Sequence, residues 1–527
     1  MLKKILNSKK PILGLPVSDW LFIKLGIIVF AVLTFWTITK SSIWFDEAFG
    51  AYMIHFNFID IAKYTAVDVH PPLYYWLLKL WSLTFGNSEL ALRSMSTLFA
   101  AVAIIFGYLL THRLFGKKAA RISLIFMALS PMLIRYGQEA RMYALVTAIA
   151  LAATYALTFA IESKKRKPWI IYGILVSLGM WTHYFSAVVW IAHWLWRADL
   201  VRRAAKKGQF LKQFFTREWI LAHIIAVGLY LPWLPFFFIQ LFIVQATGFW
   251  IAPVTPDTII NFLTNIIYYQ DVGNVKGWLA LGFIVIIVLL VTLSTKVYKS
   301  LDKPQKQSYR LIAAVAFLPP VTLFILSMPP MPSYFIDRYL ITSAIGMVLF
   351  TGITIAYSSR FLKTKWQIII AALIAALLLI GVASVWQLGN YNKNTKVSNN
   401  TRQIVEAIDE KAASGEPIIS ATPWLFYEAT FYSTTENPVY FIDDVEYKYG
   451  SLDMLKYSDN HKIKDMAAFT KDKDTVWYLC YTGEQNVCEA PFPSWRVLQD
   501  VSIKDSVSGK SAYKAVQYKT SSSKVVE

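Results

Sequence analysis

The chain has 527 residues, of which 56% are hydrophobic, and a formal net charge of +19. Its mean hydropathy is +0.44, and its apolar residues come in nearly charge-free blocks of about twenty, which excludes an ordinary soluble globular protein. The Lys and Arg residues lie in short, separate loops, which disfavours a nucleic-acid partner and favours contact with anionic membrane lipids.

Eleven stretches are apolar enough to form membrane helices. About twenty residues at about 1.5 Å rise cross a hydrocarbon core of about 30 Å, and in lipid each segment must satisfy its own backbone hydrogen bonds. The expected spans are 20–39, 90–110, 119–134, 141–161, 168–181, 184–197, 218–240, 276–296, 311–328, 339–357 and 366–386.

The fifth and sixth of these spans come from one segment, Trp169 to Trp196, which is too long for a single ordinary span. His183 lies near its middle, and we interpret the segment as a helical hairpin. If it were one helix, the topology of everything after it would invert.

With that hairpin, the basic residues gather in alternate gaps between spans, as the positive-inside rule requires. The first span follows a basic start without a small-residue cleavage site, so it is expected to stay in place rather than act as a removed signal peptide. The predicted location is the cell membrane (plasma or inner), with the N-terminus cytoplasmic and the C-terminal segment outside.

Two segments on the predicted outer side are long. The first exofacial loop, 40–89, contains aromatic, amphipathic stretches at 43–58 and 72–85, which are expected to lie in the membrane interface. The second runs from about 244 to 275 and contains another such stretch at 258–269.

The C-terminal part changes character. Helical patterns at 401–413 and 425–433 alternate with strand-like runs, which predicts a small extracytoplasmic α/β domain over 390–527 beside a mainly α, polytopic membrane domain over 1–389. The expected strands are 417–421, 439–442, 476–481, 495–501 and 512–518. The only two cysteines, Cys480 and Cys488, lie in this domain, where a disulfide is favoured over two free thiols if the domain is exported.

Ionisable side chains at a membrane are costly and point to function. Asp46 and Glu47 follow the exit of the first span, where a partly desolvated carboxylate suits a general base. The alternative is a helix start with acidic residues in its first turn. Asp68 and His70 precede a helix that Pro72 can begin, where a phosphate could bind; the alternative is a plain turn with a solvated histidine.

Three arginines lie on the predicted outer face, against the positive-inside bias. Arg135 and Arg141 flank the turn between the third and fourth spans, and Arg338 begins the tenth. Their planar guanidinium groups suit phosphate oxygens; the alternative is that they reach lipid headgroups or pair with Glu139 and Asp337. No Cys/His metal spacing, P-loop or dinucleotide-binding glycine pattern is present.

Four motifs carry a family resemblance. The sequences at 44–48 (WFDEA), 68–75 (DVHPPLYY), 138–145 (QEARMYAL) and 337–340 (DRYL) resemble those of GT-C membrane glycosyltransferases, in particular bacterial members of the protein mannosyltransferase and aminoarabinose transferase superfamily. The resemblance covers roughly residues 15–390. The aspartate–glutamate pair with His-Pro-Pro-Leu is fairly specific, whereas the last motif is weak by itself.

The resemblance implies an enzyme that moves a sugar from a polyprenyl-phosphate donor to a hydroxyl or amine of an exported lipid, protein or envelope glycan, by one inverting displacement. Asp46 would be the catalytic base and Glu47 would assist it. By the resemblance, His70 would lie near the donor phosphate, and Arg141 and Arg338 would hold the leaving phosphate. The other residues predicted to bind the donor phosphate or the substrate are Asp68, Arg135, Tyr143 and His183. No nucleotide or other cofactor is implied, and the need for a divalent metal stays open.

The sequence also suggests two other functions, and both are disfavoured. A transporter or flippase of lipid-linked sugars would carry polar residues near the membrane midplane and a visible internal repeat, whereas here the polar residues gather at one face. An inactive relative that serves as a binding subunit is disfavoured by the intact Asp46–Glu47 pair.

Overall fold

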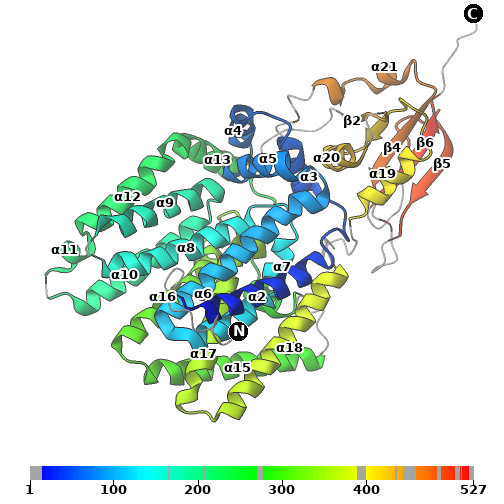
Figure 1. Cartoon of the computed structure of the whole chain (residues 1–527). Coiled ribbons are helices and arrows are strands. Elements are labelled where there is room, and N and C mark those ends of the chain that lie inside the picture. The colour runs from blue at the N-terminus through cyan, green and yellow to red at the C-terminus, as the bar shows by residue number, and fades with distance from the viewer. Residues whose placement is uncertain are drawn as a thin grey trace, which may run out of the picture. The chain divides into compact units, whose positions relative to one another are not determined.

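The computed structural model describes residues 15–163, 165–206, 208–269, 277–388, 399–433, 436–442, 455, 459–482, 488–504, 511 and 513–520. The basic residues expected before the first span, Lys3 to Lys10, lie outside these ranges. The chain forms two compact units (Figure 1): a helical unit, Met1–Trp36 with Arg93–Trp386, and a mixed unit, Thr37–Leu92 with Gln387–Glu527. The long first loop and the C-terminal segment therefore belong to the same compact unit.

The helical unit begins with helices that the sequence largely predicts. They are α2 (Val17–Phe35), α6 (Glu89–Ala128), α7 (Pro131–Gly137) and α8 (Tyr143–Glu162). Gly116 has φ 79° and interrupts α6, which is therefore two successive helices. The expected span 119–134 does not continue to its end, because Ser130 caps a new helix whose first residue is Pro131.

The segment that contains His183 is two helices. Its parts are α9 (Arg166–Thr182) and α10 (Ser186–Ala204), which pack against each other and are separated by the extended backbone of His183, φ −162° and ψ 130°. The hairpin prediction is thus confirmed at the level of helices. Buried Trp169, Tyr172 and Trp219 form the core between α9 and the next long helix, α12 (Arg217–Tyr230).

The rest of the helical unit contains short and long helices in turn. They are α11 (Phe210–Phe214), η1 (Leu231–Trp233), α13 (Leu234–Thr247), α14 (Thr258–Ile267), α15 (Gly277–Ser300), α16 (Lys303–Leu326), η3 (Asp337–Leu340), α17 (Ile341–Tyr357), η4 (Ser358–Arg360) and α18 (Thr364–Leu388). The expected span 218–240 is divided between α12, η1 and α13, with Pro232 and Pro235 at the division.

Within the described residues, eight helices are long and apolar enough to cross a membrane. α9 is shorter than the usual span, and α6 counts once although Gly116 divides it. The chain is therefore a mainly helical membrane protein, as predicted, and the expected number of eleven spans stays a prediction.

The mixed unit combines the first loop with a six-stranded sheet. The loop forms α3 (Phe45–Met53), α4 (Phe58–Val67) and α5 (Leu73–Phe85). The C-terminal segment forms α19 (Thr401–Asp409), β1 (Ile418–Ser420), α20 (Pro423–Tyr432), β2 (Val439–Ile442), η6 (Asp459–His461), β3 (Lys462–Ile463), α21 (Met466–Thr470), β4 (Thr475–Tyr481), β5 (Arg496–Ser502) and β6 (Tyr513–Lys519).

The strand order is β3-β2-β1-β4-β6-β5, with parallel pairing from β3 to β4 and antiparallel pairing among β4, β6 and β5. Ile419, Val476, Tyr478 and Val516 supply part of the buried core of this sheet, and α19 packs against β5 and β6 (Figure 1). The predicted α/β domain is thus confirmed, and its five predicted strands begin and end close to the predicted positions, whereas β3 was not predicted. Cys480 at the end of β4 forms a disulfide with Cys488.

Candidate active site

The first turn of α3 carries the two expected catalytic acids. α3 begins at Phe45 after the extended residue Trp44, so Asp46 and Glu47 lie where backbone N–H groups favour carboxylates. Glu47 is fully buried, and its carboxylate accepts a hydrogen bond from the Trp44 N–H at 3.4 Å. Asp46 is partly exposed. Glu47 therefore caps the helix, whereas Asp46, next to it, is partly exposed as a residue.

Another acidic residue, Asp68, orients His70 before α5. The Asp68 carboxylate lies 3.1 Å from Nδ1 of His70, and the two residues are 3% and 8% exposed. A carboxylate on Nδ1 favours the tautomer with its proton there and directs Nε2 to the other side of the ring. Because His70 is buried, the alternative of a solvated histidine in a plain turn is wrong. α5 packs against α3 through Tyr75 and Phe49, whose ring centroids are 5.7 Å apart.

In the helical unit, the end of α14 connects two polar groups. Arg135 of α7 donates to the Tyr269 hydroxyl at 3.0 Å and pairs with Glu139 at 2.9 Å. One helical turn earlier, the Asn265 amide donates to the Asp337 carboxylate at 2.5 Å. Arg135 therefore makes the ion pair with Glu139 that was the alternative to phosphate binding, and Tyr269 is a second partner of Arg135.

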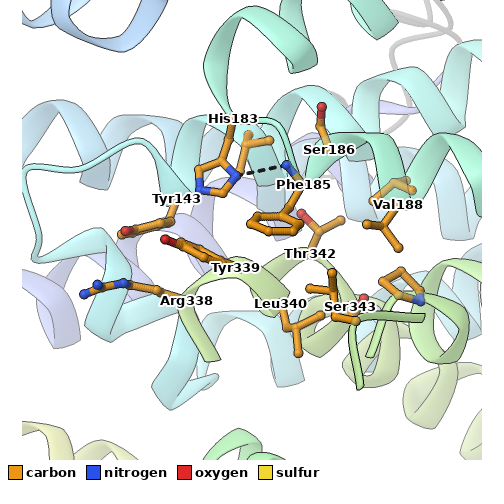
Figure 2. Close-up of a pocket in the computed structure, with 14 residues that line it drawn as sticks. Tyr143, His183, Phe185, Ser186, Val188, Arg338, Tyr339, Leu340, Thr342 and Ser343 are labelled. Carbon is orange, nitrogen blue, oxygen red and sulfur yellow. Dashed lines mark hydrogen bonds between the residues drawn. The ribbon is translucent and has the colours of Figure 1, made fainter. Parts of the chain in front are cut away.

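Tyr143, His183 and Arg338, three of the predicted substrate-binding residues, lie together in the same unit. They line a small cavity, and Figure 2 shows Tyr339 among them. The Tyr339 ring centroid lies 4.8 Å from that of His183 and 6.4 Å from that of Tyr143. The cavity measures about 10 Å³, which is room for about one water molecule. In this conformation the aromatic rings therefore fill the space.

The two remaining arginines, Arg338 and Arg141, differ in their contacts and burial. Arg338 lies over the Trp250 ring, with its Cζ 4.8 Å from the centroid. Arg141 is 2% exposed, and its backbone carbonyl accepts from the Ser96 hydroxyl at 3.2 Å, which fixes the turn before α8 against α6. Arg141 is therefore buried, whereas Arg338 is partly exposed and packs on Trp250.

An apolar cavity of about 310 Å³ lies among α6, α14, α15, α16, α17 and α18. Ile266 and Ile267 of α14 line it, next in sequence to Asn265 and close to Tyr269. α18 approaches the end of α14 closely at Gly381, where an added Cβ would lie 2.0 Å from the Ile267 carbonyl oxygen. One end of α14 therefore borders both the apolar cavity and the polar cluster of Arg135 and Asp337.

Sequence reasoning did not single out the buried acids of the mixed unit, and of these Glu428 of α20 contacts α3. It accepts hydrogen bonds from the Thr401 hydroxyl at 2.5 Å and the Asn399 amide at 2.9 Å, and from the Phe45 N–H. Burial, with a smaller contribution from the charge of Glu47, raises the pKa of Glu428 to about 7. No local pattern marks this residue, because its surroundings come from segments distant in sequence.

The structure thus gathers the predicted residues into two sets. Asp46, Glu47, Asp68 and His70 belong to the mixed unit, and the five others belong to the helical unit: Arg135, Arg141, Tyr143, His183 and Arg338. Within the described residues, no group of three or more His, Cys, Asp or Glu side chains is placed to hold a metal ion.

The sequence and the architecture are similar to those of known proteins. Residues 69–236 match the family model described as dolichyl-phosphate-mannose-protein mannosyltransferase. The whole chain is similar in structure to ArnT from Cupriavidus metallidurans in the apo state, with a TM-score of 0.63 and 11% identity, over 96% of this chain and 99% of ArnT. The ArnT structure bound to undecaprenyl phosphate gives a TM-score of 0.61 at 12% identity, over the same shares of the two chains.

No curated protein sequence matches the chain. At 11–12% identity, the likeness to ArnT shows the fold, and the family model covers a segment that includes His70, Arg135, Arg141 and His183. Together they confirm the resemblance inferred from the four motifs: the chain has the fold of the GT-C membrane glycosyltransferases.

Proposed function

We propose that the chain transfers a sugar from a polyprenyl-phosphate carrier to a hydroxyl or amine of an exported lipid, protein or envelope glycan. One observation carries this proposal: the end of α14 borders an apolar cavity of about 310 Å³, its Asn265 binds Asp337, and Tyr269, just after the helix, binds Arg135. A lipid phosphate needs such an arrangement, with apolar walls for its chain and guanidinium groups for its head. In a protein of the same fold, ArnT, undecaprenyl phosphate is bound.

The proposed reaction is a single displacement at the anomeric carbon. Asp46 accepts the proton of the acceptor hydroxyl, whose oxygen forms the new bond to the anomeric carbon as the carbon–oxygen bond to the phosphate breaks. The polyprenyl phosphate leaves with the electron pair of that bond, and the configuration of the sugar inverts. Glu47 assists by fixing the first turn of α3, because its carboxylate accepts from the Trp44 N–H.

Negative charge increases on the phosphate as it leaves, and fixed positive groups stabilise it. Arg135 and Arg141 are the main candidates, since both are nearly buried and a buried charge interacts strongly. The remaining residues proposed to bind the donor phosphate or the substrate are Asp68, His70, Tyr143, His183 and Arg338.

The proposed location is the plasma or inner membrane, with the N-terminus cytoplasmic and the mixed unit outside. The distribution of basic residues supports this orientation. The donor is expected on the outer face and no nucleotide is required.

The test is transfer by the purified, full-length protein in detergent. It is incubated with labelled polyprenyl-phosphate sugars and extracted envelope fractions, with and without a chelator, and the labelled product is identified. Asp46→Asn should abolish transfer while the protein still folds and inserts. Near-normal transfer by Asp46→Asn would overturn the assignment of the base.

Detergent also separates transfer from transport. A flippase forms no new covalent product, whereas a transferase forms one even in the absence of a sealed bilayer. Arg113→Ala is a matched control for the arginine variants, because Arg113 pairs with Glu162 outside the proposed site. Arg135→Ala and Arg141→Ala should each lower transfer by about 10²–10³-fold if they stabilise the leaving phosphate, and Arg113→Ala should not.

A further inference from the structure

The backbone just before α3 is held by residues from the C-terminal segment of the same unit. The Ile43 N–H donates to the Tyr432 hydroxyl at 2.5 Å, and the Ile43 carbonyl accepts from the Asn399 amide at 3.1 Å. The backbone N–H of Arg402 donates to the Ser42 hydroxyl at 3.1 Å. Both hydrogen-bonding groups of Ile43 are thus satisfied by side chains more than 350 residues away in the sequence.

Two of these residues also meet at a carboxylate. Glu89, at the start of α6, accepts from the Arg402 guanidinium at 2.6 Å and from the Tyr432 hydroxyl. Both Glu89 and Arg402 belong to the mixed unit. The two ends of the first loop, 37–92, are therefore connected through the same part of the C-terminal segment.

Glu428 contacts the first turn of α3 itself. It accepts from the N–H of Phe45, the residue before Asp46, and the same carboxylate accepts from Thr401 and Asn399. Asn399 thereby bridges Glu428 and the Ile43 carbonyl. In the part of the chain that the structure describes, the donors to this buried carboxyl are neutral. A carboxyl that is buried without a cationic partner costs stability. A role of Glu428 in positioning α3 would account for this cost.

The aromatic neighbour of Glu428 covers one face of α3. Tyr427 lies 5.9 Å from Phe45, 5.7 Å from Phe49 and 5.2 Å from Tyr52, measured between ring centroids. α3 has nine residues, and helices of fewer than about twelve are marginal alone in water. The orientation of α3 is therefore set by this packing, and Figure 1 shows α20 beside it.

We propose that Glu428, supported by Tyr427 and Tyr432, is a positioning residue that fixes the first turn of α3 and so directs the Asp46 carboxylate. The C-terminal α/β domain is then part of the catalytic apparatus, because its helix α20 holds the catalytic helix in place. The inference rests on the proposed function for the role of Asp46, whereas the mechanical coupling of α20 to α3 does not.

Two readouts test the proposal on the full-length protein. The first, amide hydrogen exchange over residues 43–53, requires no activity. Glu428→Ala should raise exchange in this segment at least about tenfold, and Glu428→Gln, whose amide oxygen can still accept from the Phe45 N–H, should restore most of the protection. The second, sugar transfer, should show kcat lowered by about 100-fold, as for a misplaced catalytic group, with KM for the donor changed less than about twofold.

Glu416 provides the matched control. It is also a buried glutamate of the C-terminal segment, and it accepts from the Gln517 amide at 2.7 Å and the Ala413 N–H at 3.1 Å, far in sequence from α3. Glu416→Ala should leave exchange over 43–53 and kcat close to wild type. If Glu428→Ala does not fold, Tyr432→Phe removes only the hydroxyl that accepts from Ile43 and should raise exchange at the same segment.

The outcomes separate the two hypotheses. Wild-type exchange over 43–53 in both Glu428→Ala and Tyr432→Phe would overturn the positioning role, and so would an equal effect of Glu416→Ala. Absence of any transfer by the wild-type protein would overturn the proposed function, while the exchange result would still decide the coupling.

Discussion

Glu428 is expected to make the stability of the mixed unit depend on pH. Burial raises its pKa from an ordinary 4.5 to about 7, and Glu47 on α3 adds to the shift. Among the residues that the structure describes, Tyr513 of β6 also interacts with Glu428, and burial holds the pKa of Tyr513 above its ordinary value, so that it stays neutral. The folded state therefore binds a proton at Glu428 more tightly than the unfolded state does.

The raised pKa of Glu428 stabilises the folded state at low pH. The stabilisation is fully present below about pH 4.5, is lost as the pH rises, and is gone above about pH 7. At 1.36 kcal/mol for each pKa unit, it amounts to about 3 kcal/mol. Glu428→Gln cannot ionise, so it should lack this contribution while it keeps a hydrogen-bond acceptor for Thr401.

The assay is urea unfolding of the wild type and Glu428→Gln in detergent at several pH values from 4.5 to 8. The free energy of unfolding of Glu428→Gln relative to wild type should rise by about 3 kcal/mol across this range. Glu416→Gln is the control and should keep the wild-type dependence on pH, because Glu428 is unchanged in it. A constant difference between wild type and Glu428→Gln would refute the reasoning.

Three further predictions concern stability. Gly381→Ala should lower the free energy of unfolding by at least about 1–3 kcal/mol, because the added Cβ would overlap the α14 backbone. Gly282→Ala is the control, since no atom lies within 4 Å of its added Cβ, and it should not destabilise the protein. Thermal unfolding compares the two variants. Arg135→Ala should cost about 3–5 kcal/mol by leaving buried Glu139 without its ion pair, and a melting temperature equal to that of wild type would contradict this. Cys480→Ser should cost about 2–3 kcal/mol, the loop-closure entropy of a short disulfide loop, and reductant should destabilise the wild type by the same amount and leave the variant unchanged.

The sequence predicts best where one physical constraint dominates. Apolar blocks must be helices in lipid, so α15 and α18 agree closely with the expected spans. Strands of the C-terminal domain are marked by short apolar runs between polar turns, and β2 matches its expected residues, 439–442. The break at His183 was readable because one helix could not account for so long a segment.

Other features depend on short local signals, such as a single helix cap, or on contacts between segments distant in sequence. α4 was not expected, although Asn57 is a usable N-cap and accepts from the N–H groups of Ile59 and Asp60. In contrast, nothing near Glu428 indicates its burial, because α3, α19 and β6 surround it only after folding. The same holds for Tyr269, whose partner Arg135 lies 134 residues earlier.

The connection of the first loop to the C-terminal segment has a consequence for biosynthesis. Residues 37–92 leave the ribosome about 300 residues before residue 399, the first described residue that holds Ile43. At about 5–20 residues per second, the loop waits about 15–60 seconds for its partner. Throughout that interval Phe45, Phe49 and Tyr52 lack the part of their native packing that Tyr427 supplies. Chaperone dependence and sensitivity to truncation at the C-terminus should therefore appear first in α3, near the opposite end of the chain.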